Sequence, residues 1–241
     1  MCLDLRSRVM LLAGALLFLS SLPLAAHGLW QKAVVIFEEN ADLVARTTHI
    51  QMEVFDGGGN LAKREHTTLE NYVGEGGTVQ SRYLEATRNG TDITAQKRAE
   101  RQSPLGEKGA PFADLGHSPF QRAHQENVSY APTGGVDYVD GRRALAFSFR
   151  HRMEGGGSNS GTAWLDAESG APLKTVMTMD EAPFYVRRLE LVKRYTLSER
   201  RWYLASLEID AMGQFLLFQR VYDIRTQFTN HFRSSRVVER F

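Results

Sequence analysis

The stretch Gly161-Thr-Ala-Trp-Leu-Asp-Ala-Glu-Ser-Gly-Ala-Pro-Leu-Lys174 opens the part of the chain that decides the fold, residues 161–232. Its centre carries the chemistry of a tight turn, because Asp and Ser side chains bond to nearby backbone groups and Gly accepts a positive φ. Gly170 and Pro172 stand where a hairpin would end and the next strand begin. The stretch therefore predicts two antiparallel strands joined at residues 166–172.

Apolar and polar residues alternate in the segments that follow, which is typical of half-buried strands. We expect residues 212–214 to turn the chain before a long last strand. Strands joined by such short connections pair antiparallel, since a parallel return needs a crossover of a dozen or more residues. The residues expected on one face of each of these strands are Leu173, Thr175, Met177, Met179, Leu189, Leu191, Tyr195, Tyr203, Ala205, Leu207, Ile209, Leu216, Phe218, Tyr222, Ile224 and Phe228.

The chain before residue 161 predicts one helix and further strands. Residues 29–45 place Trp30, Ala33, Val34 and Phe37 at helical spacing. Strands are expected at 47–56, 62–73, 78–95 and 136–152, and Asn89-Gly90 predicts a hairpin because both residues accept a positive φ. The predicted fold is mainly β (α+β), an unclosed antiparallel half-barrel wrapped over the N-terminal helix.

Residues 97–132 interrupt the alternation with several prolines and glycines. Long irregular segments inside a compact domain are often lids or binding loops, and we interpret this one as a lid. A plain connection is the alternative, and a short helix is expected near 119–126. The apolar residues expected in this Pro/Gly-rich lid are Leu105, Phe112, Leu115 and Phe120.

The N-terminus has the pattern of a secretory signal peptide. Arg6 and Arg8 precede the apolar run Val9–Leu19, and the small residues Ala25-Ala-His-Gly28 follow. We expect cleavage after Ala26 or Gly28, hence a signal peptide at 1–28, a single domain at 29–232 and a basic tail at 233–241. The only cysteine, Cys2, lies within the signal, so the mature chain would contain no disulfide, as suits a bacterial periplasm.

Composition and motifs argue against several classes of function. Without residues 1–28 the basic and acidic residues are equal in number, which gives no argument for nucleic-acid binding. The sequence Gly157-Ser-Asn-Ser-Gly161 departs from a nucleophile elbow because its central residue is Asn159. No two of the seven histidines have the i, i+4 spacing of a helical zinc site. We therefore predict no catalytic residues, no metal and no cofactor.

Large apolar side chains gather on one face of the expected sheet, and a single helix is too short to cover them all. Two interpretations remain open: a concave surface that binds an apolar ligand, or a core filled by the helix. The residues predicted to line such an apolar cavity are Ile50, Met52, Val54, Leu145, Phe147, Phe149, Met177, Met179, Leu216 and Phe218.

Three segments resemble the outer-membrane lipoprotein-sorting (LolA/LolB-like) superfamily. They are Val-Asp-Gly-Arg-Arg-Ala-Leu-Ala-Phe-Ser-Phe at 139–149, the stretch at 161–174 and Arg-Trp-Tyr-Leu at 201–204. The resemblance implies an unclosed half-barrel whose cavity takes acyl chains. No arginine here matches the one that latches the lid in that family.

The expected function is that of a periplasmic, non-enzymatic lipid or lipoprotein acyl-chain carrier acting in outer-membrane lipoprotein sorting. The alternative is an envelope protein-interaction or sensor module of the same fold with a filled core, and an unrecognised hydrolase is a third. The expected partners are lipid or lipoprotein acyl chains and an envelope protein. We expect no nucleic acid and at most a peripheral contact with a membrane.

Overall fold

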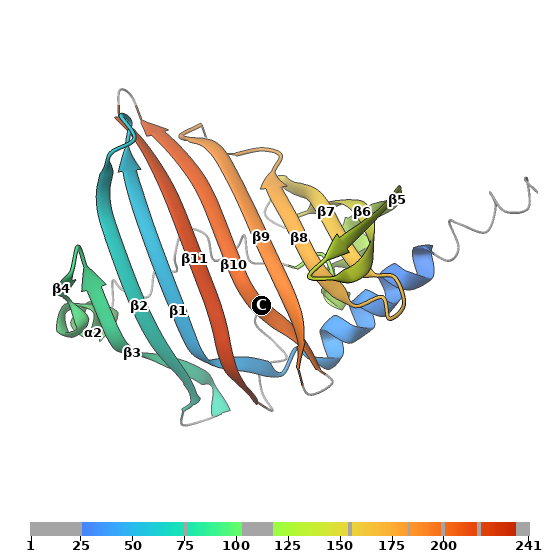
Figure 1. The fold of residues 1–241 in the computed structure, drawn as a ribbon, viewed down its shortest axis with the longest axis horizontal. Helices are drawn as coiled ribbons and strands as arrows, with labels where there is room; N and C mark the ends of the chain where they lie inside the picture. The colour runs from blue at the N-terminus through green and yellow to red at the C-terminus, as the bar shows by residue number, and fades with distance from the viewer. Residues whose placement is uncertain are drawn as a thin grey trace, which may run out of the picture.

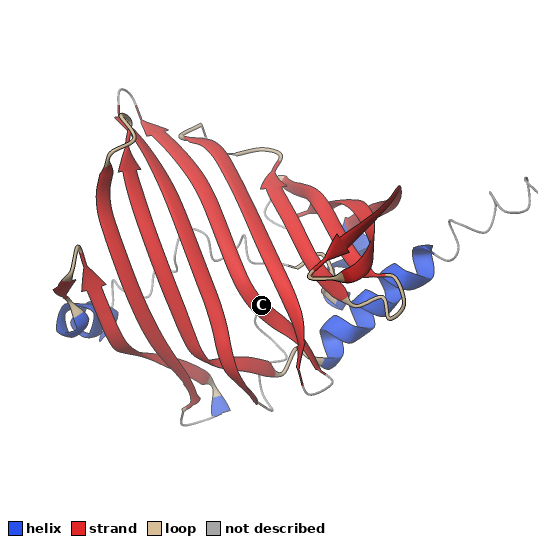
Figure 2. Cartoon of the chain, in the orientation of Figure 1, coloured by secondary structure: helices blue, strands red, loops and turns tan. Residues whose placement is uncertain are grey.

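A computed structural model describes residues 26–74, 77–102, 118–153, 156–182, 184–198, 201–215 and 218–234 of the chain. They form one antiparallel sheet with a helix at residues 26–39, at one end of the sheet (Figure 1). Strands dominate the chain and helices are few (Figure 2). The predicted fold class, an unclosed antiparallel half-barrel with an N-terminal helix, is confirmed.

The sheet has eleven strands in the order β4-β3-β2-β1-β11-β10-β9-β8-β7-β6-β5. The elements are β1 Leu43–Asp56, β2 Leu61–Val73, β3 Val79–Arg88, β4 Thr91–Asp92, α2 Thr94–Gln102, the 3-10 helix η3 Arg122–Asn127, β5 Val128–Val139, β6 Arg142–Arg152, β7 Ser158–Asp166, β8 Pro172–Met179, β9 Val186–Ser198, β10 Arg201–Phe215 and β11 Phe218–Arg233.

Two meanders make up this sheet, and they join where the first long strand meets the last. β1 pairs with β11 from Leu43↔Arg233 to Asp56↔Arg220, so the middle of the sheet is built from the two ends of the domain. Each meander follows the predicted turn chemistry. Asn89 and Gly90 take φ of 50° and 83° between β3 and β4, and Gly170 takes φ of 77° between β7 and β8.

Several predicted boundaries are wrong. The helix ends at residue 39, not 45, because Asn40 and Ala41 donate backbone hydrogen bonds to the Phe37 and Glu38 carbonyls in a turn. β10 continues through Met212-Gly213-Gln214 to Phe215, so the expected turn there is absent, and Phe215 pairs with Phe218. β5 begins at Val128 rather than near 136, because this edge strand accommodates Pro132 at a register shift.

The segment predicted as an irregular lid contains regular structure at both ends. α2 occupies Thr94–Gln102 beside β3, and η3 occupies Arg122–Asn127, which confirms a short helix near the predicted place. Residues 103–117 lie outside the described residues, and Leu105, Phe112 and Leu115 of the predicted lid lie there with them. Residues 1–25 and 235–241 also lie outside, so most of the predicted signal peptide and tail is not described.

Candidate functional site

The strand register lines up apolar residues from seven neighbouring strands in one row. Residues paired directly across antiparallel strands point to the same face of a sheet. We call this face the helix-side face, because Trp30 of the N-terminal helix packs on it. The row runs Phe149–Gly161–Met177–Leu191–Ile209–Ile224–Met52 and ends at Glu65 on β2.

The helix fills the β5–β9 end of this face. Trp30 has no exposed surface, and its indole Nε1 donates to Gln125 Oε1 at 3.0 Å. Its ring stacks on Tyr130 at 4.2 Å between centroids. It also contacts Phe120 at 5.0 Å, Phe147 at 5.8 Å and Phe149 at 6.3 Å. This end is therefore an aromatic core, in which Phe120 packs as an interior residue.

Burial decreases along the row towards β1. Met177 and Leu191 are 2% exposed, whereas Ile224 and Met52 are only half-buried. The half-buried apolar residues that adjoin one another on β10, β11 and β1 are Leu207, Tyr222, Ile224, Ile50 and Met52, and we call them the apolar strip.

The ten predicted lining residues do not share one environment. Phe147, Phe149, Met177 and Val54 are buried, and Leu145 and Met179 are half-buried against the core around Trp30. Ile50 and Met52 lie in the apolar strip. Leu216 lies outside the described residues, and Phe218 is placed only as the first residue of β11. The structure thus brings eight of the ten to the helix-side face and divides them between the core, the strip and its edge.

Gly161 is required where β7 and β8 pack closely in this row. A Cβ atom at this position would lie 2.0 Å from the carbonyl oxygen of Val176, a backbone atom that cannot rotate away. Gly161 pairs with Met177, so the missing side chain lets β8 approach β7 within the filled part of the face.

A charged cluster ends the row. Glu65 is 6% exposed, and its Oε1 accepts from Lys63 Nζ at 3.1 Å and Arg88 Nε at 2.6 Å. Lys97 Nζ of α2 lies 3.9 Å from Oε2. Burial raises the pKa of Glu65, but the hydrogen bonds from Arg88 and Lys63 and the charge of Lys97 outweigh it, so the net pKa is lowered. The carboxylate is therefore ionised at neutral pH.

A second charged group lies inside the apolar face. Lys193 on β9 is 4% exposed and pairs in register with Thr175 and Leu207. Burial lowers the pKa of Lys193 to about 8. Burial also raises the pKa of the neighbouring Tyr195 to about 12, against hydrogen bonds to Ser118 and Thr175.

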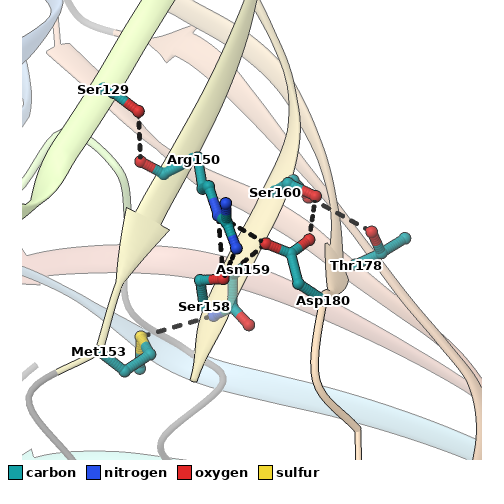
Figure 3. Close-up of polar contacts among 8 residues, drawn as sticks. All are labelled: Ser129, Arg150, Met153, Ser158, Asn159, Ser160, Thr178 and Asp180. Carbon is teal, nitrogen blue, oxygen red and sulfur yellow. Dashed lines mark hydrogen bonds and ion pairs between the residues drawn. The ribbon is translucent and has the colours of Figure 1, made fainter. Parts of the chain in front are cut away.

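The serine-rich segment that superficially resembles a nucleophile elbow forms a structural network instead (Figure 3). Ser158 Oγ donates to Asp180 Oδ2 at 2.6 Å, and Ser160 Oγ donates to Asp180 Oδ1. Arg150 Nε lies 3.0 Å from Asp180 Oδ2. The hydrogen bonds from both serines hold the pKa of Asp180 below its usual range, so this carboxylate is a poor base for activating a serine.

Two histidines lie close together in the part of the chain that the structure describes. The rings of His124 and His151 lie 5.7 Å apart, and His151 pairs with Asn159, whose side chain points to the opposite face from Ser158 and Ser160. Within those same residues, no group of three or more His, Cys, Asp or Glu side chains is placed to hold a metal ion.

Sequence reasoning missed Glu65, Lys63 and Lys193 as residues of the helix-side face. For Glu65 and Lys63 a signal existed, because both share the period-two face of Thr67 and Leu69 on β2. This signal was obscured because β2 is a polar strand as a whole. Lys97, which also contacts Glu65, comes from α2, a helix without large apolar residues.

Among the described residues, no helix is long and apolar enough to span a membrane. No protein-family model matches the chain, and no curated protein matches it either.

Solved structures with a similar fold cover most of the chain at low identity. One is a protein domain from Vibrio parahaemolyticus assigned to outer membrane lipoprotein sorting, with 12% identity and a TM-score of 0.40 over 85% of this chain and 92% of the other. A complex of MucA and MucB from Pseudomonas aeruginosa matches with 11% identity and a TM-score of 0.26 over 87% and 97%. A LolA superfamily protein from Nitrosomonas europaea matches with 10% identity and a TM-score of 0.33 over 85% and 94%.

Proposed function

We propose that this protein is a periplasmic, non-enzymatic carrier that binds the acyl chain of a lipid or lipoprotein on the apolar strip. The observation that carries the proposal is the gradient along the row, from the buried Met177 and Leu191 to the half-buried Ile224 and Met52. The strip spans three strands, with the buried Thr226 of β11 between Leu207 and Ile50, and it lies next to a core that the N-terminal helix already fills.

The physical chemistry of an acyl chain fits such a surface. Each methylene group removed from water contributes about 0.8 kcal/mol, so a chain of about 16 carbons represents roughly 12 kcal/mol of gross transfer free energy. Met52 adds a flexible side chain that adapts to chains of different shape. A protein that moves such a chain through an aqueous compartment must cover it, and the apolar strip provides the surface.

The proposal also includes a periplasmic location and a non-enzymatic role. The N-terminal sequence predicts export, and we place the mature protein in the periplasm, where the carrier would deliver its cargo to the outer membrane. Ser158 and Ser160, the candidate nucleophiles, both donate their hydroxyl hydrogen bonds to Asp180, which is ion-paired with Arg150. These contacts support binding without catalysis.

An envelope protein-interaction or sensor module is the second candidate. It is favoured by the pair Phe184 and Tyr185 in the β8–β9 connection, which are 77% and 49% exposed and contact each other edge to face at 5.4 Å. Adjacent exposed aromatic residues are typical of protein interfaces.

Native mass spectrometry of the mature protein, purified from a periplasmic extract without detergent, tests the first candidate. We expect a reproducible added mass that extracts into organic solvent. An apo mass that stays unchanged after addition of an acylated peptide would contradict the carrier and favour the second candidate.

A further inference from the structure

The cluster around Glu65 concentrates positive charge on the helix-side face. Lys63 comes from β2, Arg88 from β3 and Lys97 from α2, and all three point their charges at one carboxylate. Glu100, whose side chain is 51% exposed, lies 3.7 Å from Lys97 and offsets one more charge. A positive charge remains in excess over these two acidic residues.

The three cations keep donors for a further partner. Their side chains are 35%, 36% and 21% exposed, so solvent reaches them although Glu65 itself is buried. Arg88 binds Glu65 through Nε, and a guanidinium has five N–H donors in all. The ionised Glu65 therefore positions three cations without exhausting their capacity to bind an anion.

The cluster adjoins the apolar strip directly. Glu65 is the register partner of Met52, and Lys63 is the register partner of Val54. Glu65 on β2 and Leu207 on β10 are separated by three interstrand spacings, about 14 Å at the usual distance between strands. An apolar surface of this width with cations at one end matches an amphiphile that has an acyl chain and a negatively charged head group.

We propose that Lys63, Arg88 and Lys97 bind the anionic head group, a phosphate or a carboxylate, of the lipid whose chain lies on the apolar strip. This inference rests on the proposed function, and it names the class of lipid. Charge-assisted hydrogen bonds from Lys and Arg to such an anion are short and strong, so the head group fixes the orientation of the lipid. The chain then extends from β2 across β1 and β11.

The test compares three probes on the full mature protein, with the alkyl probes kept as monomers: dodecyl phosphate, dodecyl maltoside and inorganic phosphate. We expect dodecyl phosphate to bind at least about tenfold more tightly than the uncharged maltoside, as for a few charge-assisted contacts. The variant Lys63→Gln/Lys97→Gln should lose this preference and keep its affinity for the maltoside. Lys63→Arg keeps the charge and should retain the preference for dodecyl phosphate. It shows whether a substitution at this position is compatible with folding and binding.

Arg64→Gln is the matched control. Arg64 stands between Lys63 and Glu65 in sequence but pairs with Glu53 at 2.7 Å on the opposite face, so its loss should leave the preference unchanged. Equal binding of both alkyl probes, unaffected by Lys63→Gln/Lys97→Gln, would overturn the head-group site and leave the acyl-chain site standing. Binding of inorganic phosphate as tight as that of dodecyl phosphate would overturn the link to a lipid. Failure of both alkyl probes to bind would overturn the proposed function itself.

Discussion

Met52 on β1 lies directly opposite Glu65 on β2, so the apolar row that crosses seven strands ends at an ionised, buried carboxylate. The junction lies at the half-buried end of the helix-side face and not at the end filled by Trp30. An apolar surface that ends at a cluster of charges is suited to a molecule that is itself apolar at one end and charged at the other.

Polar substitution in the apolar strip should weaken lipid binding without unfolding the protein. Ile50→Gln/Met52→Gln keeps the side-chain size but removes apolar contacts that contribute about 1–3 kcal/mol in total, so affinity for an alkyl probe should fall about tenfold or more. A fluorescence titration measures this affinity, and thermal unfolding checks the fold. Gln51→Ala, between them in sequence but on the opposite face, should bind as the wild type does. Equal affinity in all three proteins would exclude the strip as the binding surface.

Trp30 should be a principal contributor to the stability of the β5–β9 end. Trp30→Ala removes a fully buried indole from four aromatic contacts, and the expected loss is about 3–5 kcal/mol in the free energy of unfolding. Phe184→Ala, at a side chain that is 77% exposed, should change stability by less than about 0.5 kcal/mol. Urea denaturation of both variants checks this, and similar midpoints would show that the helix is not part of the core.

Gly161→Ala should destabilise the sheet, because the new Cβ meets the Val176 carbonyl oxygen at 2.0 Å and the backbone must move. The expected loss is about 1–3 kcal/mol, as for other overpacked interior sites. Gly135→Ala is the control, since its nearest neighbour, Thr133 Oγ1, lies at an ordinary 3.6 Å. A Gly161→Ala variant as stable as Gly135→Ala would mean that β7 and β8 are less closely packed than described.

Lys193 should make stability rise with pH above about 8. Below pH 8 the amine is charged in both states, and the folded protein bears the cost of burying the charge. Between about 8 and 10.5 the folded state has released the proton that the unfolded state still holds, so raising the pH favours folding, by up to about 3 kcal/mol.

Lys193→Met should therefore abolish the rise in stability between pH 8 and about 9.5, where Tyr195 is still protonated in both states. Lys174→Met, on the opposite face over the Trp164 ring, should keep the rise. Denaturation at a series of pH values distinguishes the two, and a flat wild-type profile would contradict a buried, perturbed amine.

Local chemistry in the sequence predicted much of the sheet. The Asn89-Gly90 hairpin, the turn at Gly170 and the shared face of Met177, Leu191 and Ile209 all follow from residues close together in the chain. The pairing of β1 with β11 joins residues 164 to 190 positions apart, and no local pattern contains that contact. The helix α2 was missed because Thr94–Gln102 has no large apolar residue, and only Ala95 and Ala99 mark its apolar side.

The sequence predicted which residues share the helix-side face. It did not predict which of them lie in the core under the helix and which lie in the apolar strip. Alternation placed Ile50 and Phe147 on one side of the sheet, and the register confirms that they share it. Which of them the helix covers depends on where Trp30 docks, and that is a tertiary contact between Trp30 and residues about a hundred positions away. The cation cluster assembles from β2, β3 and α2, and the polar composition of β2 obscured its signal.

Photo-crosslinking with a palmitate analogue that carries a diazirine in its acyl chain tests the central claim most directly. After irradiation and peptide mass spectrometry, the account predicts adducts on residues 50–54 of β1 and 222–226 of β11, suppressed by an excess of unlabelled palmitate. Adducts confined to the exposed Phe184–Tyr185 pair, or scattered over the opposite face, would contradict an acyl-chain site on the apolar strip.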